Sequence, residues 1–303
     1  MGSYIAIGYA CNQNCKGCPI KEKEKINFAL DELKMKIDEI AESLDKIVTL
    51  SGGEPTVHPA FLDIVNYMME KDLYVTILTN AERFSDKTFV NEFYEKIKID
   101  HIRIITTIHS NEVTVHEEQN GKPDSFNKTI NGLNNLFMKG INITIKHCVS
   151  KMNYNNTEEF LSFIDDTFHP SVDIQLWGLD YSGLDRESAK KLFIPFREMQ
   201  EKLEKAFDKY FSIYEKNGRK ISVHNIPLCA VDPIYWNLFV KPQDVEAYGK
   251  YYDPKNTLSD FRDDSGCYSQ ECKSCYVNEI CMGTYKSAFE YFGDYIVNKI
   301  DEA

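Results

Sequence analysis

The chain contains 303 residues, of which 43% are hydrophobic and 27% charged, and its formal net charge is −12. It is long enough for one α/β barrel of ordinary size, and its composition is typical of a soluble globular protein. No apolar run approaches the roughly 18 residues of a membrane helix, no secretory leader opens the chain, and the acidic balance argues against nucleic acid as a partner. We therefore expect a cytoplasmic protein that binds neither membrane nor nucleic acid.

Short apolar runs alternate with helical patterns through the first two thirds of the chain. Strands are predicted at 4–9, 47–50, 73–79, 101–107, 141–148 and 172–177, and helices at 29–44, 59–71, 86–97, 125–138, 157–167 and 187–215. Such alternation indicates βαβ units and a parallel sheet, which a doubly wound fold would also satisfy. Because the unusual residues follow the first four strands, the pattern favours the C-terminal face of a barrel.

Three cysteines, Cys11, Cys15 and Cys18, come directly after the first predicted strand. Three thiolates can hold three irons of one iron–sulfur cube and leave the fourth iron open. The chain has nine cysteines, an odd number that falls into clusters, and this favours metal ligation in a reducing compartment over a disulfide framework. A zinc site that uses the same cysteines and a distant fourth ligand is the alternative.

The run Gly52-Gly53-Glu54-Pro55 follows the second predicted strand. Its glycines permit a tight turn and close approach to a ligand, and Glu54 can accept hydrogen bonds from an ammonium group. Together with the C-x3-C-x2-C motif, this run resembles the radical S-adenosylmethionine (SAM) superfamily. The resemblance implies a partial (β/α)6 TIM-like barrel and a [4Fe-4S] cluster bound by three cysteines and SAM. In that family, reductive cleavage of SAM gives a 5′-deoxyadenosyl radical that abstracts hydrogen from the substrate.

The resemblance also implies which residues bind SAM. Polar groups at the ends of the second to fifth strands would contact its amino group, ribose and carboxylate, although each could instead be a helix cap or a satisfied turn residue. Gly17 stands where many members have an aromatic residue, so only a backbone contact to adenine would survive there, and Tyr9, Ile20 or Trp177 would pack against the base. The predicted SAM-binding residues are Gly17, Gly52, Gly53, Glu54, Pro55, Thr79, Asn80, Thr107, His109, Lys146, Asn153 and Trp177.

After residue 216 the alternation ends, and we predict a barrel over 1–216 and a cysteine-rich region over 217–303 with a closing helix at 284–298. Cys272, Cys275 and Cys281 resemble part of the SPASM or twitch extension, which holds auxiliary [4Fe-4S] clusters. Cys229 is the preferred fourth ligand and Cys267 its competitor.

Only one auxiliary cluster is expected, because Tyr285 stands where the full extension has a further cysteine. A structural zinc bound by the same four cysteines is the alternative.

SPASM and twitch extensions occur mainly in enzymes that modify ribosomally synthesised peptides. The leading hypothesis is therefore a peptide maturase that forms a cross-link, thioether, epimer or oxidised residue, with Cys148 either a hydrogen donor or a buried apolar residue. The acidic balance would suit a basic peptide, and the expected partners are a precursor peptide and an electron donor such as flavodoxin or ferredoxin. Because the first strand begins at residue 4, a separate protein or the C-terminal region would bind the leader peptide.

Two other functions compete with peptide maturation. One is a radical SAM dehydrogenase or related enzyme that acts on a small molecule such as a sugar or cyclitol, with the auxiliary cluster as electron acceptor. The other is a non-catalytic iron–sulfur or zinc protein with a degenerate site.

Overall fold

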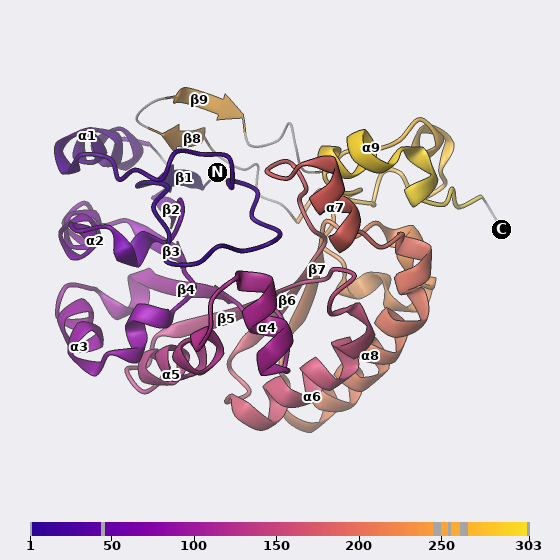
Figure 1. Ribbon diagram of the computed structural model, residues 1–303, viewed down its shortest axis with the longest axis horizontal. Helices are drawn as coiled ribbons and strands as arrows, with labels where there is room; N and C mark the ends of the chain where they lie inside the picture. The colour runs from indigo at the N-terminus through magenta and orange to yellow at the C-terminus, as the bar shows by residue number, and fades with distance from the viewer. Residues whose placement is uncertain (1, 44–45, 245–249, 254–255, 261–265, 302–303) are drawn as a thin grey trace.

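Seven parallel strands form an open sheet in the part of the chain that the computed structural model describes, residues 2–43, 46–244, 250–253, 256–260 and 266–301 (Figure 1). The strand order is β7-β6-β5-β4-β3-β2-β1, and the antiparallel β8–β9 hairpin extends the sheet beside β1. The strands are β1 (Ser3–Ala6), β2 (Ile47–Ser51), β3 (Tyr74–Leu78), β4 (Ile102–Thr107), β5 (Asn142–Cys148), β6 (Asp173–Trp177), β7 (Ile221–His224), β8 (Lys250–Asp253) and β9 (Asn256–Asp260). The predicted fold class, a partial TIM-like barrel, is confirmed.

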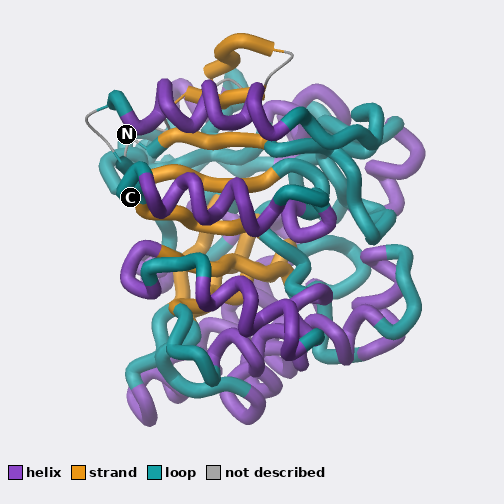
Figure 2. Tube along the Cα trace, turned by 90° about the vertical axis from the view of Figure 1, so that its left-hand side faces the viewer, coloured by secondary structure: helices purple, strands orange, loops and turns teal. Residues whose placement is uncertain are grey.

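Helices cover the outer face of this sheet, as Figure 2 shows with the strands behind them. The described α-helices are α1 (Leu30–Ala41), α2 (Phe61–Glu70), α3 (Lys87–Glu95), α4 (Val113–Asn120), α5 (Ser125–Phe137), α6 (Thr157–Thr167), α7 (Arg186–Leu192), α8 (Phe196–Asn217) and α9 (Lys286–Phe292). Alternation along each strand separates two faces: in β4, Ile102 and Ile104 are buried in the core, whereas Ile105 and Thr107 face inward. The inner face is therefore free to carry polar groups.

Of the predicted helices, one is divided into two and another ends early. The helix predicted at 187–215 is two helices, because Pro195 lacks an amide hydrogen and disfavours helical geometry in the residue before it. The closing helix ends at Phe292, where Gly293 adopts a φ of 75°. Residue 44, the predicted end of the first helix, lies outside the described residues.

Residues just after the predicted barrel add the strand β7, which the sequence did not predict. β7 pairs with β6 in parallel, with Trp177 opposite His224. The fully buried Arg219 fixes this strand by donating hydrogen bonds to the carbonyl oxygens of Phe168 and Val172, both at 2.7 Å. Its guanidinium lies 3.7 Å from the Asp165 carboxylate. Residues beyond 216 thus contribute to the inner face, and the proposed division at 216/217 stays a prediction.

Candidate active site

The inner face of the sheet and the loops after its strands line one cavity of about 790 Å³. Most residues that the sequence assigned to SAM and its cluster lie around it: Cys11, Cys15, Gly17, Cys18, Gly52, Gly53, Glu54, Thr79, Asn80, Thr107, His109, Lys146 and Trp177, together with Cys148. Residues far apart in the chain therefore meet in one place. Tyr9 and Ile20, the other candidates for packing against adenine, also line the cavity.

Two of the predicted SAM-binding residues do not line this cavity. Pro55 is buried at the start of a short 3-10 turn. Asn153 is also buried, and its amide donates hydrogen bonds to the carbonyl oxygens of His109 (2.7 Å) and Cys148 (2.9 Å). Its oxygen accepts a hydrogen bond from the Ser150 amide at 2.8 Å. Asn153 therefore joins the ends of β4 and β5.

The cysteine loop is held by α4, a helix without the apolar periodicity that would have predicted it. The amides of Asn14 and Lys16 donate hydrogen bonds to the carbonyl oxygens of Asn120 (2.9 Å) and Gln119 (2.7 Å) at the end of α4. The chain then turns at Gly121, where a Cβ atom would lie 2.6 Å from the Asn14 oxygen. Only glycine permits this close approach.

The three thiols of the loop lie in an environment that disfavours their ionisation. Burial raises the pKa of Cys11 to about 11, although the Gln13 amide donates to its sulfur at 3.4 Å. Burial also raises the pKa of Cys15 and of Cys18, and the neighbouring sulfurs raise that of Cys15 further. Since iron binds thiolates, its positive charge would offset this penalty.

The donor set fits a cluster with one open iron. Among the described residues, no group of three or more His, Cys, Asp or Glu side chains is arranged to hold a single metal ion. Three cavity-lining thiols without a fourth protein ligand are what a cube completed by SAM requires.

The Gly-Gly-Glu-Pro run packs against the cysteine loop. The amides of Gly53 and Glu54 donate to the carbonyl oxygens of Gly8 and Ala10, both at 2.9 Å. A Cβ atom on Gly53 would lie 2.2 Å from the Ala10 oxygen, which explains why glycine is needed here. This contact places the Glu54 carboxylate beside the loop.

The Glu54 carboxylate is buried and held by four hydrogen bonds. Oε1 accepts from the Thr56 amide (3.0 Å), the Thr56 hydroxyl (2.6 Å) and the Thr79 hydroxyl (2.7 Å), and Oε2 accepts from the Asn80 amide (2.6 Å). Burial raises its pKa, and these hydrogen bonds oppose the shift. Among the described residues, Glu54 has no cationic partner, so an ammonium group would suit it.

A second polar network ties the loop to the end of β3. The Asn80 amide group donates to Asn12 at 2.7 Å, and Gln13 donates to the Glu82 carboxylate at 2.7 Å. Glu82 is buried and pairs with Lys122. The sequence analysis did not identify Gln13, Glu82 or Lys122, because no local motif marks them. Gln13 is 69 residues from Glu82 in the chain, and Glu82 is 40 residues from Lys122.

His109 faces the cavity as a neutral ring. Burial lowers its pKa to about 3, and the neighbouring His116, His147 and Lys146 lower it further. Its Nδ1 is buried and has no hydrogen-bond partner among the described residues. At neutral pH a ring that stays neutral suits a hydrogen bond to a ligand better than it suits the transfer of protons.

The inner face of β5, β6 and β7 carries a stack of three side chains. The Lys146 ammonium lies 3.9 Å from the centroid of the Trp177 ring, and this ring stacks on His224 at 4.4 Å with an angle of 1°. Burial lowers the pKa of His224 to about 4, with a further contribution from the charge of Lys146. His224 was missed because β7 was not predicted. Cys148 lies nearby, and burial raises the pKa of its thiol.

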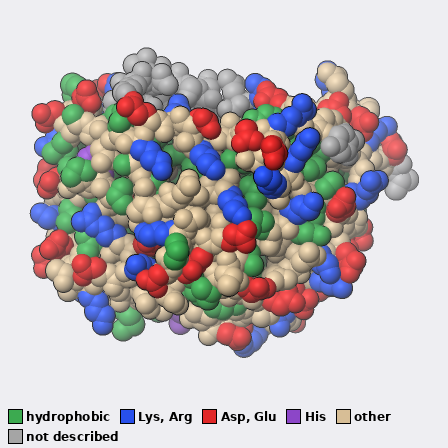
Figure 3. All heavy atoms as spheres, viewed as in Figure 1, with side chains coloured by type: hydrophobic (Ala, Val, Ile, Leu, Met, Phe, Trp, Pro, Cys, Tyr) green, Lys and Arg blue, Asp and Glu red, His purple; other side chains and the backbone are tan. Residues whose placement is uncertain are grey.

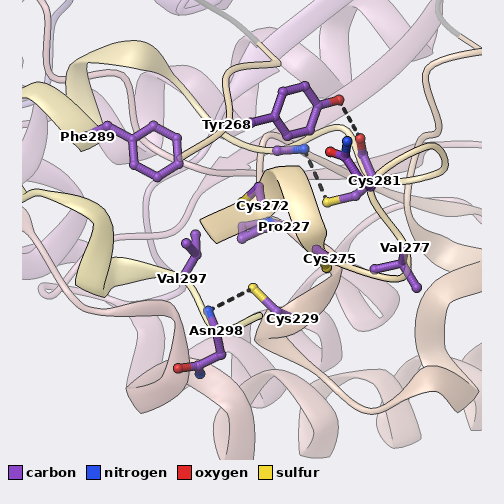
Figure 4. Close-up of a pocket in the computed structure, with 12 residues that line it drawn as sticks. Pro227, Cys229, Tyr268, Cys272, Cys275, Val277, Cys281, Phe289, Val297 and Asn298 are labelled. Carbon is purple, nitrogen blue, oxygen red and sulfur yellow. Dashed lines mark hydrogen bonds between the residues drawn. The ribbon is translucent and has the colours of Figure 1, made fainter. Parts of the chain in front are cut away.

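The four cysteines predicted for the auxiliary site line a second cavity, shown in Figure 4. Every one of their sulfurs accepts a hydrogen bond: Cys229 from the Asn298 amide (3.4 Å), Cys272 from the Ser269 hydroxyl (3.4 Å), Cys275 from the Ile300 amide (3.5 Å), and Cys281 from the amides of Leu228 (3.4 Å) and Gly283 (3.3 Å). Burial raises the pKa of Cys229 to about 12 and also raises that of Cys281. Donors to sulfur stabilise thiolate ligands, so this set fits a metal centre.

Cys267 does not line the cavity of the four cysteines. Its backbone forms a bridge with Thr284, with hydrogen bonds of 2.8 and 3.1 Å. Tyr285, which replaces the further cysteine of the full extension, lines the main cavity instead. Of the two candidates for a fourth ligand, Cys229 is the one that lies with Cys272, Cys275 and Cys281.

An open parallel barrel with a three-cysteine loop at its mouth is the arrangement of enzymes that generate radicals from SAM. The family model of the Radical SAM superfamily matches residues 5–166, more than half of the chain, and the protein belongs to this superfamily. None of the described helices is both long enough and apolar enough to cross a membrane.

Curated relatives are similar to about half of the chain. AdoMet-dependent heme synthase of Methanosarcina barkeri is 29% identical over 147 residues, which are 47% of this chain and 41% of the relative. Mycofactocin maturase MftC of Mycolicibacterium smegmatis is 25% identical over 157 residues, 51% of this chain and 39% of the relative. The chain thus spans about two fifths of the length of these relatives.

Solved structures resemble the whole chain in fold. SuiB of Streptococcus suis, bound to the precursor peptide SuiA, superposes with a TM-score of 0.67 at 14% identity and covers 98% of this chain and 75% of SuiB. The enzyme anSMEcpe with bound AdoMet and the Cp18Cys peptide gives a TM-score of 0.66 at 14% identity, covering 98% of this chain and 92% of that one. At these identities the likeness shows the fold alone.

Proposed function

We propose that the protein cleaves SAM reductively and uses the resulting radical to modify a ribosomally synthesised peptide. The observation that supports this most directly is the meeting of three cysteine thiols and the Glu54 carboxylate in one cavity, where Glu54 has no cationic partner among the described residues. Cys11, Cys15 and Cys18 would hold the [4Fe-4S] cluster, and Glu54 would accept the SAM ammonium. When bound, the cluster and SAM supply a 5′-deoxyadenosyl radical for hydrogen abstraction.

The remaining cavity residues would orient SAM and the substrate. Thr79 and Asn80 hold the Glu54 carboxylate in place, and His109 offers the cavity a neutral ring whose Nδ1 lacks a partner among the described residues. Cys148 keeps its proton at neutral pH because burial raises its pKa, and a protonated thiol is the form that can donate a hydrogen atom. The reaction would thus end in epimerisation if Cys148 delivers hydrogen, and in bond formation or oxidation if it does not.

Peptide substrates are supported by two kinds of relative. MftC is named as a maturase, and the structures of SuiB and anSMEcpe contain bound peptides. A precursor peptide would therefore be the partner, with flavodoxin or ferredoxin as electron donor, and a separate protein or the C-terminal region would bind the leader peptide. The four C-terminal cysteines would hold one auxiliary [4Fe-4S] cluster, with zinc as the alternative.

Small-molecule chemistry is the second candidate function. It is favoured by the names of two relatives from Methanosarcina barkeri, AdoMet-dependent heme synthase and Fe-coproporphyrin III synthase. The substrate would then be a tetrapyrrole or another small molecule with oxidisable carbon centres.

The test is SAM cleavage by anaerobically reconstituted protein after reduction with dithionite. We expect 5′-deoxyadenosine from the wild type and none from Cys15→Ala. Iron and zinc counts then distinguish the metals: two clusters' worth of iron supports an auxiliary cluster, whereas one cluster plus stoichiometric zinc contradicts it. A mass change in the product of a short reading frame beside the gene would establish the peptide substrate, and its absence with every such peptide would favour the small molecule.

A further inference from the structure

Lys146, a cation that lines the main cavity, has no acidic partner among the described residues. Lys146 lies over the Trp177 ring, and no described carboxylate forms an ion pair with it. Deeper in the same face, Arg103 donates two hydrogen bonds to the Thr144 hydroxyl, at 2.7 and 3.2 Å. His224 is neutral, so the stack carries a net positive charge. A ring contact is worth about 0.5–2 kcal/mol and does not neutralise an ammonium group.

Among the described residues, none of the acidic side chains that line the cavity pairs with Lys146, and each of them accepts hydrogen bonds elsewhere. Glu54 accepts four hydrogen bonds. Asp180 accepts from the Ser182 amide (2.9 Å) and the Ser287 hydroxyl (2.8 Å), and Asp244 accepts from an amide at 3.1 Å. No carboxylate of the described residues therefore supplies a counter-charge at the stack, and a cation in a partly desolvated cavity is stabilised by the anionic group of a bound ligand.

The position of the stack indicates which ligand brings that anion. Glu54, Thr79 and Asn80 gather at the ends of β2 and β3, whereas the stack lies on β5, β6 and β7 at the other side of the sheet. We infer that Lys146, seated on Trp177, binds a carboxylate of the substrate rather than that of SAM. This inference rests on the proposed function and deepens it.

A substrate that carries a carboxylate is the opposite of the basic peptide that the net charge of −12 led us to expect. The net charge does not describe the local surface: Figure 3 shows Lys and Arg side chains interspersed with Asp and Glu over the visible face, without a continuous acidic surface. Around the cavity, Lys21, Lys23 and Lys25 add positive charge to that of Lys146. A carboxylate of an acidic peptide or of a tetrapyrrole propionate satisfies the same chemistry.

The experiment compares ligands that differ only in carboxylates. Reconstituted holoenzyme carrying Trp236→Phe retains Trp177 as its only tryptophan, whose fluorescence reports binding at the stack. The probes are two pools of end-capped decapeptides, identical except that one carries Glu where the other carries Gln. Coproporphyrin III and its tetramethyl ester form a second pair, followed by the absorbance of the porphyrin. Affinity for SAM is measured separately by equilibrium dialysis.

We expect the carboxylate member of one pair to bind at least about tenfold more tightly than its neutral partner, since removal of a buried charge partner has an effect of this size. Lys146→Gln should abolish that preference and Lys146→Arg should retain most of it. Lys151→Gln, an exposed lysine that does not line the cavity, serves as the matched control and should behave as the wild type. The pair that shows the preference identifies the source of the carboxylate.

Two results would overturn the inference. One is equal binding of both members in both pairs, and the other is a tenfold loss of SAM affinity in Lys146→Gln, which would assign this lysine to SAM. Absence of 5′-deoxyadenosine from the wild type would instead refute the proposed function, so the two failures are distinguishable.

Discussion

Replacement of Glu54 by Gln separates SAM binding from folding. The carboxylate accepts three hydrogen bonds at Oε1 and one from the Asn80 amide at Oε2, at 2.6 Å. If the Gln oxygen takes the Oε1 position, its NH2 group faces the Asn80 N–H, so one charge-assisted hydrogen bond is lost. Such a bond contributes about 1.5–3 kcal/mol, but the variant also no longer buries a charge. We therefore expect stability to fall by only about 1 kcal/mol.

The effect on SAM should be much larger. Removing one partner of a buried ammonium–carboxylate pair costs about 3 kcal/mol, or roughly a hundredfold in affinity. Equilibrium dialysis with reconstituted protein measures the dissociation constant of SAM, and chemical denaturation measures stability. Glu70→Gln, at an exposed position on α2, is the matched control. A SAM affinity within threefold of the wild type in a folded Glu54→Gln variant would refute the assigned role of Glu54.

Three further substitutions test other parts of the structure. Cys229→Ala should lose the metal of the C-terminal site, whereas Cys267→Ala should retain it, and counting the bound metal in each variant checks this. Equal loss in both variants would contradict the choice of Cys229 as the fourth ligand. Gly53→Ala should lower 5′-deoxyadenosine formation at least about tenfold, because the new methyl group meets a carbonyl oxygen at 2.2 Å. Gly2→Ala is the control, because an added Cβ atom there would lie 3.4 Å from an Ile47 methyl group and the backbone φ of Gly2 is not positive. Asp165→Asn should lower stability by about 2 kcal/mol, because it leaves the buried Arg219 guanidinium without its carboxylate partner. Burial raises the pKa of Asp165, but its cationic and amide partners outweigh this and hold it below its usual value, so the wild-type advantage should vanish in denaturation curves as pH falls below about 4.

The parts of the site that could be predicted from sequence are local. Cys11, Cys15 and Cys18 lie within eight residues, and Gly52 to Pro55 are contiguous, so their spacing alone indicated the chemistry. The strands could be predicted for a similar reason, because a buried parallel strand is a short apolar run between helical patterns. Turn and cap positions shifted the predicted ends by a few residues.

The parts that could not be predicted depend on long-range pairing. α4 has a mostly polar sequence without apolar periodicity, so the sequence did not predict it. Its role becomes visible only in the structure, where carbonyl oxygens at its end accept hydrogen bonds from the amides of Asn14 and Lys16. β7 has four residues, too few to show a period, and is fixed by the hydrogen bonds of Arg219 to two carbonyl oxygens of the loop between α6 and β6. The inner-face position of His224 follows from β7, so it was missed with the strand.

These long-range contacts also explain how one loop can serve two demanding roles. In the proposed function, Cys11, Cys15 and Cys18 would converge on iron while the same loop left room for SAM, and a free loop of eight residues would lose that arrangement to conformational entropy. In this protein α4 holds the loop backbone from one side, and the Asn80 and Glu82 side chains hold it from the end of β3. The local motif therefore supplies the ligands, whereas the distant contacts supply their pre-organisation, which is the property that a cofactor site needs most.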